Sequence, residues 1–78
     1  MPRARAVDWK VRVKGLLKAE LKKRNLSYGD LATRLATIGV SDTERNISNK
    51  LSRGTFTAVF MIQCLAAIGC NNLHLGDD

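Results

Sequence analysis

The chain is poor in the residues that build metal centres, disulfide frameworks and aromatic binding platforms. Its 78 residues include one His, two Cys, one Pro and few aromatics. Cys64 and Cys70 are six positions apart, and with His74 as the only imidazole they do not form a ligand set spaced for zinc. Both cysteines lie in or beside an apolar run, where free Cys packs as a small hydrophobe. We therefore expect no metal, no other cofactor, no disulfide and a reducing compartment.

Long apolar runs and recognisable catalytic groupings are also missing. No apolar stretch approaches the ~20 residues that a membrane span needs, and the charged N-terminus lacks the apolar core of a signal peptide. His74 is isolated in sequence, and neither cysteine has a sequence partner of a type that activates a nucleophile. We expect a cytoplasmic protein that is not an enzyme, spans no membrane and has no evident small-molecule ligand.

The chain does contain enough apolar sequence for one small ordered domain. Its composition is 45% hydrophobic, and a chain of this size buries about 60% of the surface that it exposes when unfolded. No internal repeat, low-complexity tract or Gly-rich phosphate loop divides it. Residues 1–78 are therefore expected to form a single unit with a flexible basic arm at 1–7, a helical core at 8–70 and a short tail at 71–78.

Positive charge is concentrated in the first third of the chain. The net charge is +6, yet residues 1–24 carry nine Lys or Arg against two acidic residues, and the remainder is nearly neutral. Four lysines recur every four residues and form a basic stripe on one helix flank, at Lys10, Lys14, Lys18 and Lys22. Such asymmetry favours a polyanionic partner over a face that is merely solvated.

The first expected helix has a start signal, a buried face and a stop signal. Asp8 is a suitable N-cap, and Asn25 suits the left-handed position that ends a helix. The apolar residues between them recur at the spacing of one buried face, at Trp9, Val13, Leu16, Leu17 and Leu21. This pattern predicts an amphipathic helix that carries the basic stripe beside its apolar side.

The second expected helix covers about 28–38. Ser27 and Asp30 form a variant of the capping box, in which the side chain of each residue bonds the backbone amide of the other. Gly39 stops the helix in the manner of a Schellman motif, with Val40 placed to touch Leu35. A short helix followed by a tight stop is the first half of a helix-turn-helix.

The third expected helix covers about 42–52 and begins at a second capping box, formed by Ser41 and Glu44. At 100° per residue, Ile47 and Leu51 lie on its inner face. Four polar residues gather on the opposite side, namely Arg45, Asn46, Asn49 and Arg53. Arg and Asn are the side chains that bond guanine and adenine in a major groove, so this side is a candidate reading face.

Gly54 ends the third helix, and Thr57 can cap a fourth over 58–68. That fourth segment is apolar all round except for Gln63, so a single buried stripe does not account for it. It is either the central core helix or the contact of a homodimer. The tail adds at most one short turn, around Leu73 and Leu75.

The segment from about Lys22 to Ile68 resembles a known class. Leu-Ser-Tyr-Gly-Asp-Leu-Ala at 26–32 is similar to the start of the second helix in lambda-repressor-like, Cro-type helix-turn-helix domains, and residues 47–48, 53–54 and 65–69 resemble the later elements of that class. A closer resemblance, to a small bacterial family of uncharacterised domains, rests on Trp9, the run at 13–22 and Thr-Glu-Arg-Asn-Ile at 43–47. The resemblance implies an all-α, lambda-repressor-like bundle of four or five helices.

Carried over residue by residue, the resemblance implies contacts to double-stranded DNA. It implies base contacts in the major groove at Thr43, Glu44, Arg45, Asn46 and Asn49. It implies DNA backbone contacts at Ser27, Tyr28, Lys50, Arg53 and Thr55, together with amides at the start of the second helix. The class touches phosphates from its second helix and from the loop after its third, whereas the excess charge here lies on the first helix and the arm. A different partner for the basic stripe therefore stays open.

The leading hypothesis is sequence-specific DNA binding by a small bacterial transcriptional regulator, because helical pattern, reading-face chemistry and charge agree. The alternative is an antitoxin-like module of helix-turn-helix shape that binds proteins or dimerises without reading DNA, supported by the apolar excess of 58–68. The basic first helix also permits RNA, an acidic protein or a membrane surface as partner. The aromatic residues do not form an obvious stacking platform for bases.

Overall fold

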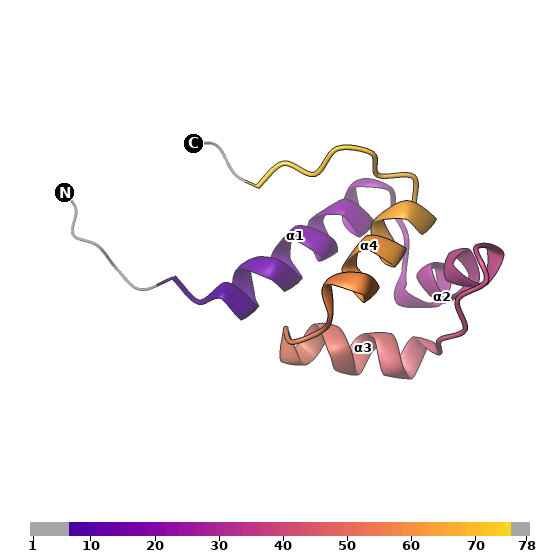
Figure 1. Cartoon of the computed structure of the whole chain (residues 1–78), viewed down its shortest axis with the longest axis horizontal. Helices are drawn as coiled ribbons and strands as arrows, with labels where there is room; N and C mark the ends of the chain where they lie inside the picture. Colours follow the sequence, from indigo (N-terminus) through magenta and orange to yellow (C-terminus); the bar gives the residue numbers. More distant parts are fainter. Residues whose placement is uncertain (1–6, 76–78) are drawn as a thin grey trace.

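The computed structural model describes residues 7–75, so residues 1–6 of the arm expected at 1–7, and residues 76–78 of the tail, lie outside the described residues. The described chain is all-α and contains four helices joined by short loops (Figure 1). The helices are α1 (Trp9–Lys23), α2 (Tyr28–Thr37), α3 (Glu44–Arg53) and α4 (Ala58–Ala67). The all-α fold class expected from the sequence is confirmed.

One hydrophobic core joins all four helices. Each helix contributes at least two buried residues to it, and together they are Leu17, Leu21, Leu31, Leu35, Ile47, Leu51, Phe60, Cys64 and Leu65, with Ile68 just after α4. Full burial of such a side chain contributes about 1.5–3 kcal/mol relative to leaving it in water. Because α2 packs against both α3 and α4, and α1 against α3, the orientation of α3 is set from two sides.

The capping expected for α1, α2 and α4 is confirmed. The Asp8 carboxylate accepts from the amides of Lys10 and Val11, and the Thr57 hydroxyl accepts from the amide of Phe60. At the start of α2 both reciprocal bonds of the capping box between Ser27 and Asp30 are present. These side chains satisfy amides that have no partner inside the helix.

Three of the helices end in the same way. Asn25, Gly39 and Gly69 follow the C-caps of α1, α2 and α4, and all three have a left-handed φ, between 57° and 83°. The next amide then bonds back to a carbonyl five residues earlier, as from Val40 to Leu35 at 2.9 Å. This is the Schellman arrangement that Asn25 and Gly39 predict, and it turns the chain sharply after each helix.

The predicted start of the third helix was wrong. Its N-cap is Thr43, whose hydroxyl accepts from the amide of Asn46, so α3 begins at Glu44 and Ser41 takes no part in a capping box. The cause is Asp42, whose carboxylate accepts from the amide of Thr43 and from Lys50 Nζ. The helix therefore begins two residues later than the sequence pattern suggests.

Trp9 was also predicted wrongly, as a member of the buried face of α1. Its side chain is 66% exposed, whereas Leu17 and Leu21 are buried as expected and Val13 and Leu16 are half-buried. The reason is length. A helix of 15 residues extends about 22 Å and helices of ten residues about 15 Å, so the first turn of α1 projects beyond the other helices (Figure 1).

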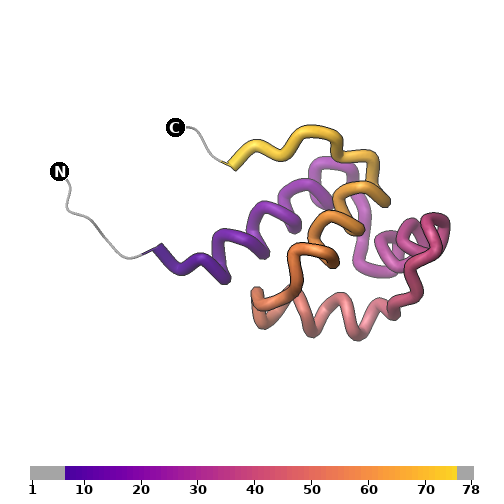
Figure 2. Tube along the Cα trace, viewed as in Figure 1, coloured from indigo at the N-terminus to yellow at the C-terminus, as the bar shows by residue number. Residues whose placement is uncertain are grey.

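The chain after α4 contains no helical turn among residues 70–75, so the short turn expected near Leu73 and Leu75 is not found. The segment runs back along α1 instead (Figure 2), where the Arg12 side chain donates to the carbonyl of Leu75.

At the C-terminal end of α1, Glu20 is buried and accepts a hydrogen bond of 2.6 Å from Arg24. The bond from Arg24 is the main reason why the pKa of Glu20 lies below its usual value.

We expect Gly54→Ala to destabilise the domain more than Gly39→Ala. Both glycines have a left-handed φ, 70° and 83°, so an Ala strains the backbone at either position. At Gly54 the new Cβ would also lie 2.7 Å from the carbonyl oxygen of Lys10, whereas nothing lies within 4 Å at Gly39. Urea unfolding should show that Gly39→Ala lowers the free energy of unfolding by about 1 kcal/mol and that Gly54→Ala lowers it by at least about twice as much. Equal losses would contradict close packing of α1 against the end of α3.

Candidate nucleic-acid interface

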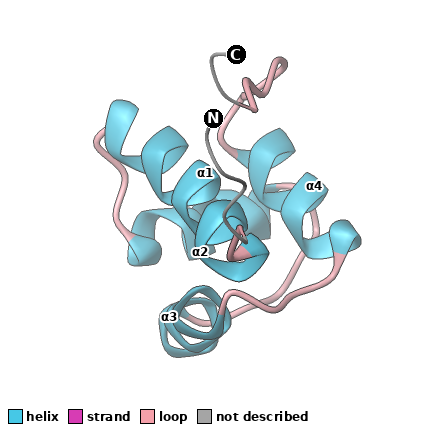
Figure 3. Ribbon diagram, turned by 90° about the vertical axis from the view of Figure 1, so that its left-hand side faces the viewer, coloured by secondary structure: helices cyan, strands magenta, loops and turns pink. Residues whose placement is uncertain are grey.

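The outer face of α3 carries the polar residues that the sequence analysis grouped there. Ile47 and Leu51 are 0% and 1% exposed and pack into the core, and this forces the opposite side of α3 into solvent. Figure 3 looks along α3 and shows it at one edge of the bundle, with a whole side away from the other helices. The residues exposed on α3 include Arg45, Asn46, Asn49 and Arg53. All four side chains are therefore exposed to solvent, as their positions on the helix predict.

Tyr28 brings α2 into contact with this face. It is the first residue of α2, it is half-buried, and it lines an open hollow of about 450 Å³. The other residues that line this hollow all belong to α3, namely Glu44, Arg45, Ser48 and Asn49. The structure thus brings a predicted backbone-contact residue together with three predicted base-contact residues. Ser48 was not predicted as a site residue. It is half-buried between the core side and the outer face of α3, and it therefore lines the hollow.

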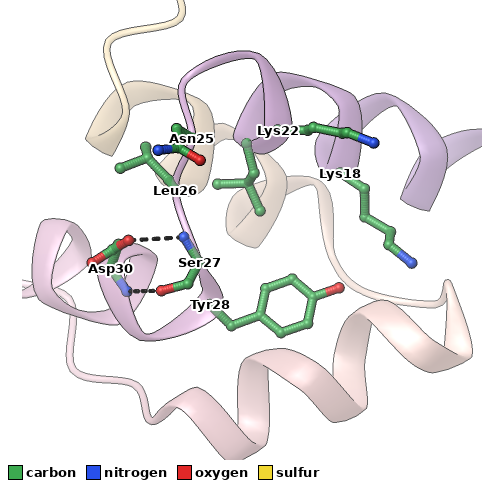
Figure 4. A pocket seen from close by; sticks show the side chains of 8 residues that line it. Lys18, Lys22, Asn25, Leu26, Ser27, Tyr28 and Asp30 are labelled. Carbon is green, nitrogen blue, oxygen red and sulfur yellow. Dashed lines mark hydrogen bonds between the residues drawn. The ribbon is translucent and has the colours of Figure 1, made fainter.

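A second hollow, of about 520 Å³, lies on the other side of Tyr28. Lys18 and Lys22 of α1 line it together with Asn25, Ser27 and the Tyr28 ring (Figure 4). In Figure 4 the side chain of Lys18 extends from α1 towards the Tyr28 ring, below which α3 passes. Because Tyr28 belongs to both hollows, the basic flank of α1 and the outer face of α3 are parts of one continuous surface.

The other two lysines of the stripe lie at the C-terminal end of α3. Lys14 Nζ donates to the carbonyl oxygen of Ser52 at 3.3 Å, which places a cation at the negative end of the helix dipole. The backbone of Lys10 lies directly against Gly54, where α3 ends. This half of the predicted stripe therefore lies beside the end of α3.

Three predicted contact residues are engaged inside the protein, and the first of them is Ser27, whose hydroxyl caps α2. The Thr43 hydroxyl caps α3, and Lys50 Nζ pairs with Asp42 at 2.7 Å and lies 4.3 Å from the centre of the Phe60 ring. Phe60 in turn meets the Phe56 ring edge-on, with 5.4 Å between ring centres. Lys50 therefore ties α3 to α4 and to the preceding loop rather than extending outwards.

Asp42 is the residue that the sequence analysis missed. Its side chain is only 7% exposed, and burial alone would raise its pKa. The bonds from Lys50 and from the amide of Thr43 outweigh burial, so the pKa of Asp42 lies below its usual value. No periodic signal could have revealed this ion pair, because Asp42 lies outside the helix and eight residues before its partner.

Elsewhere in the described residues, no group of three or more His, Cys, Asp or Glu is placed to hold a metal ion. No helix there is long and apolar enough to cross a membrane.

Cys64 lies in the core, as its apolar context predicts, and burial raises the pKa of its thiol to about 12. The thiol is therefore protonated and packs as a small apolar group.

The family comparison covers nearly all of this architecture. The model of a domain of unknown function, DUF6471, matches residues 9–73, a range that contains all four helices and both hollows. This chain belongs to the DUF6471 family. No curated protein and no solved structure matches it. The surface that α1, α2 and α3 share is the candidate functional site of this DUF6471 domain.

We expect Lys50→Met to destabilise the DUF6471 domain by about 2 kcal/mol at pH 7, because a buried carboxylate loses its charged donor. The folded-state pKa of Asp42 is lowered, so the stabilisation is present above the usual Asp pKa of 3.8 and is lost as the pH falls through the folded value. Urea unfolding should give a difference in the free energy of unfolding between wild type and variant that is smaller at pH 3 than at pH 7. Lys18→Met, which removes an exposed lysine, is the control, and an equal loss from both variants would contradict the assignment.

Proposed function

We propose that this domain binds double-stranded DNA in a sequence-specific manner, as the helix-turn-helix domain of a small transcriptional regulator. In this proposal α2 and α3 form the helix-turn-helix, and α3 enters the major groove. The observation that carries the proposal is the placing of Arg45 and Asn49 on the solvent side of a helix whose other side is fully buried. An α-helix is about as wide as the major groove, so one exposed face of this kind suffices for reading.

The chemistry of the exposed face suits base edges. Arg45 can donate two hydrogen bonds to guanine O6 and N7, and Asn49 can bond adenine N6 and N7. Asn46 adds a second amide on the same side, and Glu44 at the start of α3 can accept from a cytosine amino group. Each well-made bidentate pair discriminates against a wrong base by about 1–3 kcal/mol.

Groups that suit DNA phosphates surround this face. The N-terminus of α2 lies beside it, and the first-turn amides there favour an anion. The Tyr28 ring lies between the two hollows, and Arg53 and Thr55 are exposed at the far end of α3. Lys50 is left out of the proposed contacts because Asp42 already neutralises it.

The test is selection from a pool of random duplex DNA, followed by binding of single variants to the enriched site. We expect an enriched motif, and a loss of about 1–3 kcal/mol in binding free energy for Arg45→Ala or Asn49→Ala, with preference flattened at one position. Arg34→Ala is the matched control, since it removes an exposed arginine from α2 outside both hollows. Absence of any enriched motif, or equal losses on all sequences, would refute base reading.

A second candidate function is supported by the outer side of α4. Val59 and Ile62 are 65% and 63% exposed, and with Ala58 and Ala66 they form an apolar stripe on a helix that has no charged residue. A surface of this kind favours contact with another protein, and a second copy of the chain meets an equally uncharged stripe. We therefore propose homodimerisation through α4 as the alternative, or addition, to DNA reading.

Sedimentation of the purified domain over a range of concentrations tests this candidate. If α4 forms the contact, the wild type should show a monomer–dimer equilibrium that the Val59→Ser, Ile62→Ser double variant shifts to monomer. Ile38→Ser is the matched control, because Ile38 is 46% exposed but lies at the end of α2. A wild type that stays monomeric at every concentration would eliminate self-association as the role of this stripe.

A further inference from the structure

We infer that the lysine stripe of α1, defined as Lys10, Lys14, Lys18 and Lys22, binds successive phosphates of one DNA strand along the wall of the groove that α3 occupies. This inference rests on the proposed function and adds to it a second contact element outside α2 and α3. Two observations and one geometric argument carry it: the place of the stripe beside α3 and the start of α2, the absence of described acidic partners for its lysines, and the width of the major groove.

The N-terminal half of the stripe contacts the end of the proposed reading helix, and its other half lies near the start of α2. Lys14 donates to the carbonyl of Ser52 in the last turn of α3, and the backbone of Lys10 touches Gly54. Further along α1, Lys18 and Lys22 line the hollow that ends at Tyr28, whose ring also borders Arg45 and Asn49. Lys10 and Lys14 thus lie at the C-terminal end of α3. Lys18 and Lys22 lie near the start of α2 (Figure 4).

The charges of the stripe are not neutralised within the described part of the chain, whereas several other basic residues have acidic partners. Lys23 and Arg24 share Glu20 on the opposite flank of α1, and Lys50 pairs with Asp42. None of the stripe lysines forms a salt bridge with a described acidic residue. Four lysines without a described acidic partner therefore lie along one flank of α1.

The width of the groove decides what the stripe can reach. The major groove is about 12 Å wide, and an α-helix with its side chains fills it. An element packed against the flank of that helix must therefore face the sugar-phosphate backbone rather than the bases. Lysines four residues apart are separated by about 6 Å along the axis of α1, so the stripe presents a row of cations to a row of phosphates.

Contacts of this kind leave a measurable signature. Each phosphate neutralised by a lysine releases condensed counterions, so the logarithm of affinity falls with the logarithm of salt concentration by about 0.9 per contact. Such contacts carry no sequence information and add equally to binding of any duplex. The stripe should therefore contribute to the salt dependence of binding without changing the preferred motif.

The experiment compares fluorescence anisotropy titrations of wild type and variants against the selected duplex and a scrambled duplex, over a series of KCl concentrations. The Lys18→Gln, Lys22→Gln double variant should reduce the salt slope by about two units, and substitution of all four lysines by about three to four. The ratio of the affinity for the selected duplex to the affinity for the scrambled duplex should stay within about threefold of the wild-type ratio, because the base contacts are unchanged. Lys18 and Lys22 are exposed, so urea unfolding should show a wild-type midpoint for the double variant.

The matched control is the Arg12→Gln, Lys23→Gln double variant, which removes the same charge from the same helix but outside the stripe. The inference is supported if the salt dependence of affinity is reduced in the stripe variants and stays close to wild type in the control variant. Equal slopes for the stripe and control variants would overturn it while leaving an enriched motif, and hence the proposed function, intact. A wild type without preference for any duplex would overturn both. A stripe effect seen only on single-stranded RNA would overturn the inference in favour of an RNA partner.

Discussion

The burial of Ile47 and Leu51 is the constraint on which the rest of this surface depends. With both side chains out of water, α3 cannot rotate about its axis without exposing apolar area and leaving a cavity. Its solvent side is then determined, and so is the direction in which its polar side chains extend. The ion pair between Asp42 and Lys50 and the contact of Lys50 with Phe60 hold the same helix at its other edge.

Much of the fold could be predicted because its signals are local. The caps at Asp8, Ser27 and Thr57 and the stop at Gly39 depend on a few neighbouring residues, so their geometry follows from residue type and spacing. The buried faces of α2 and α3 likewise follow from helical periodicity. The grouping of exposed polar residues on α3 is a consequence of the same periodicity, which is why that part of the candidate site was predictable.

The features that escaped prediction depend on how the helices meet. Trp9 fits the apolar pattern of α1, yet only packing reveals that its turn projects beyond the shorter helices. The start of α3 is decided by a carboxylate that pairs across a helix end, so the rival cap at Ser41 looked equally suitable. The side faced by the lysine stripe, and the role of Tyr28 between two hollows, are also properties of the packed arrangement.

Gly54, at the end of α3, lies so close to the backbone of Lys10 in the first turn of α1 that an added Cβ would overlap it. A backbone-to-backbone contact has few soft degrees of freedom, so the two helices are held at a fixed separation before any partner arrives. A ligand that engages both helices at once therefore meets a preorganised surface, and little conformational entropy remains to be lost when it binds. For so small a domain, rigidity of this kind offsets the modest area that is available for contact.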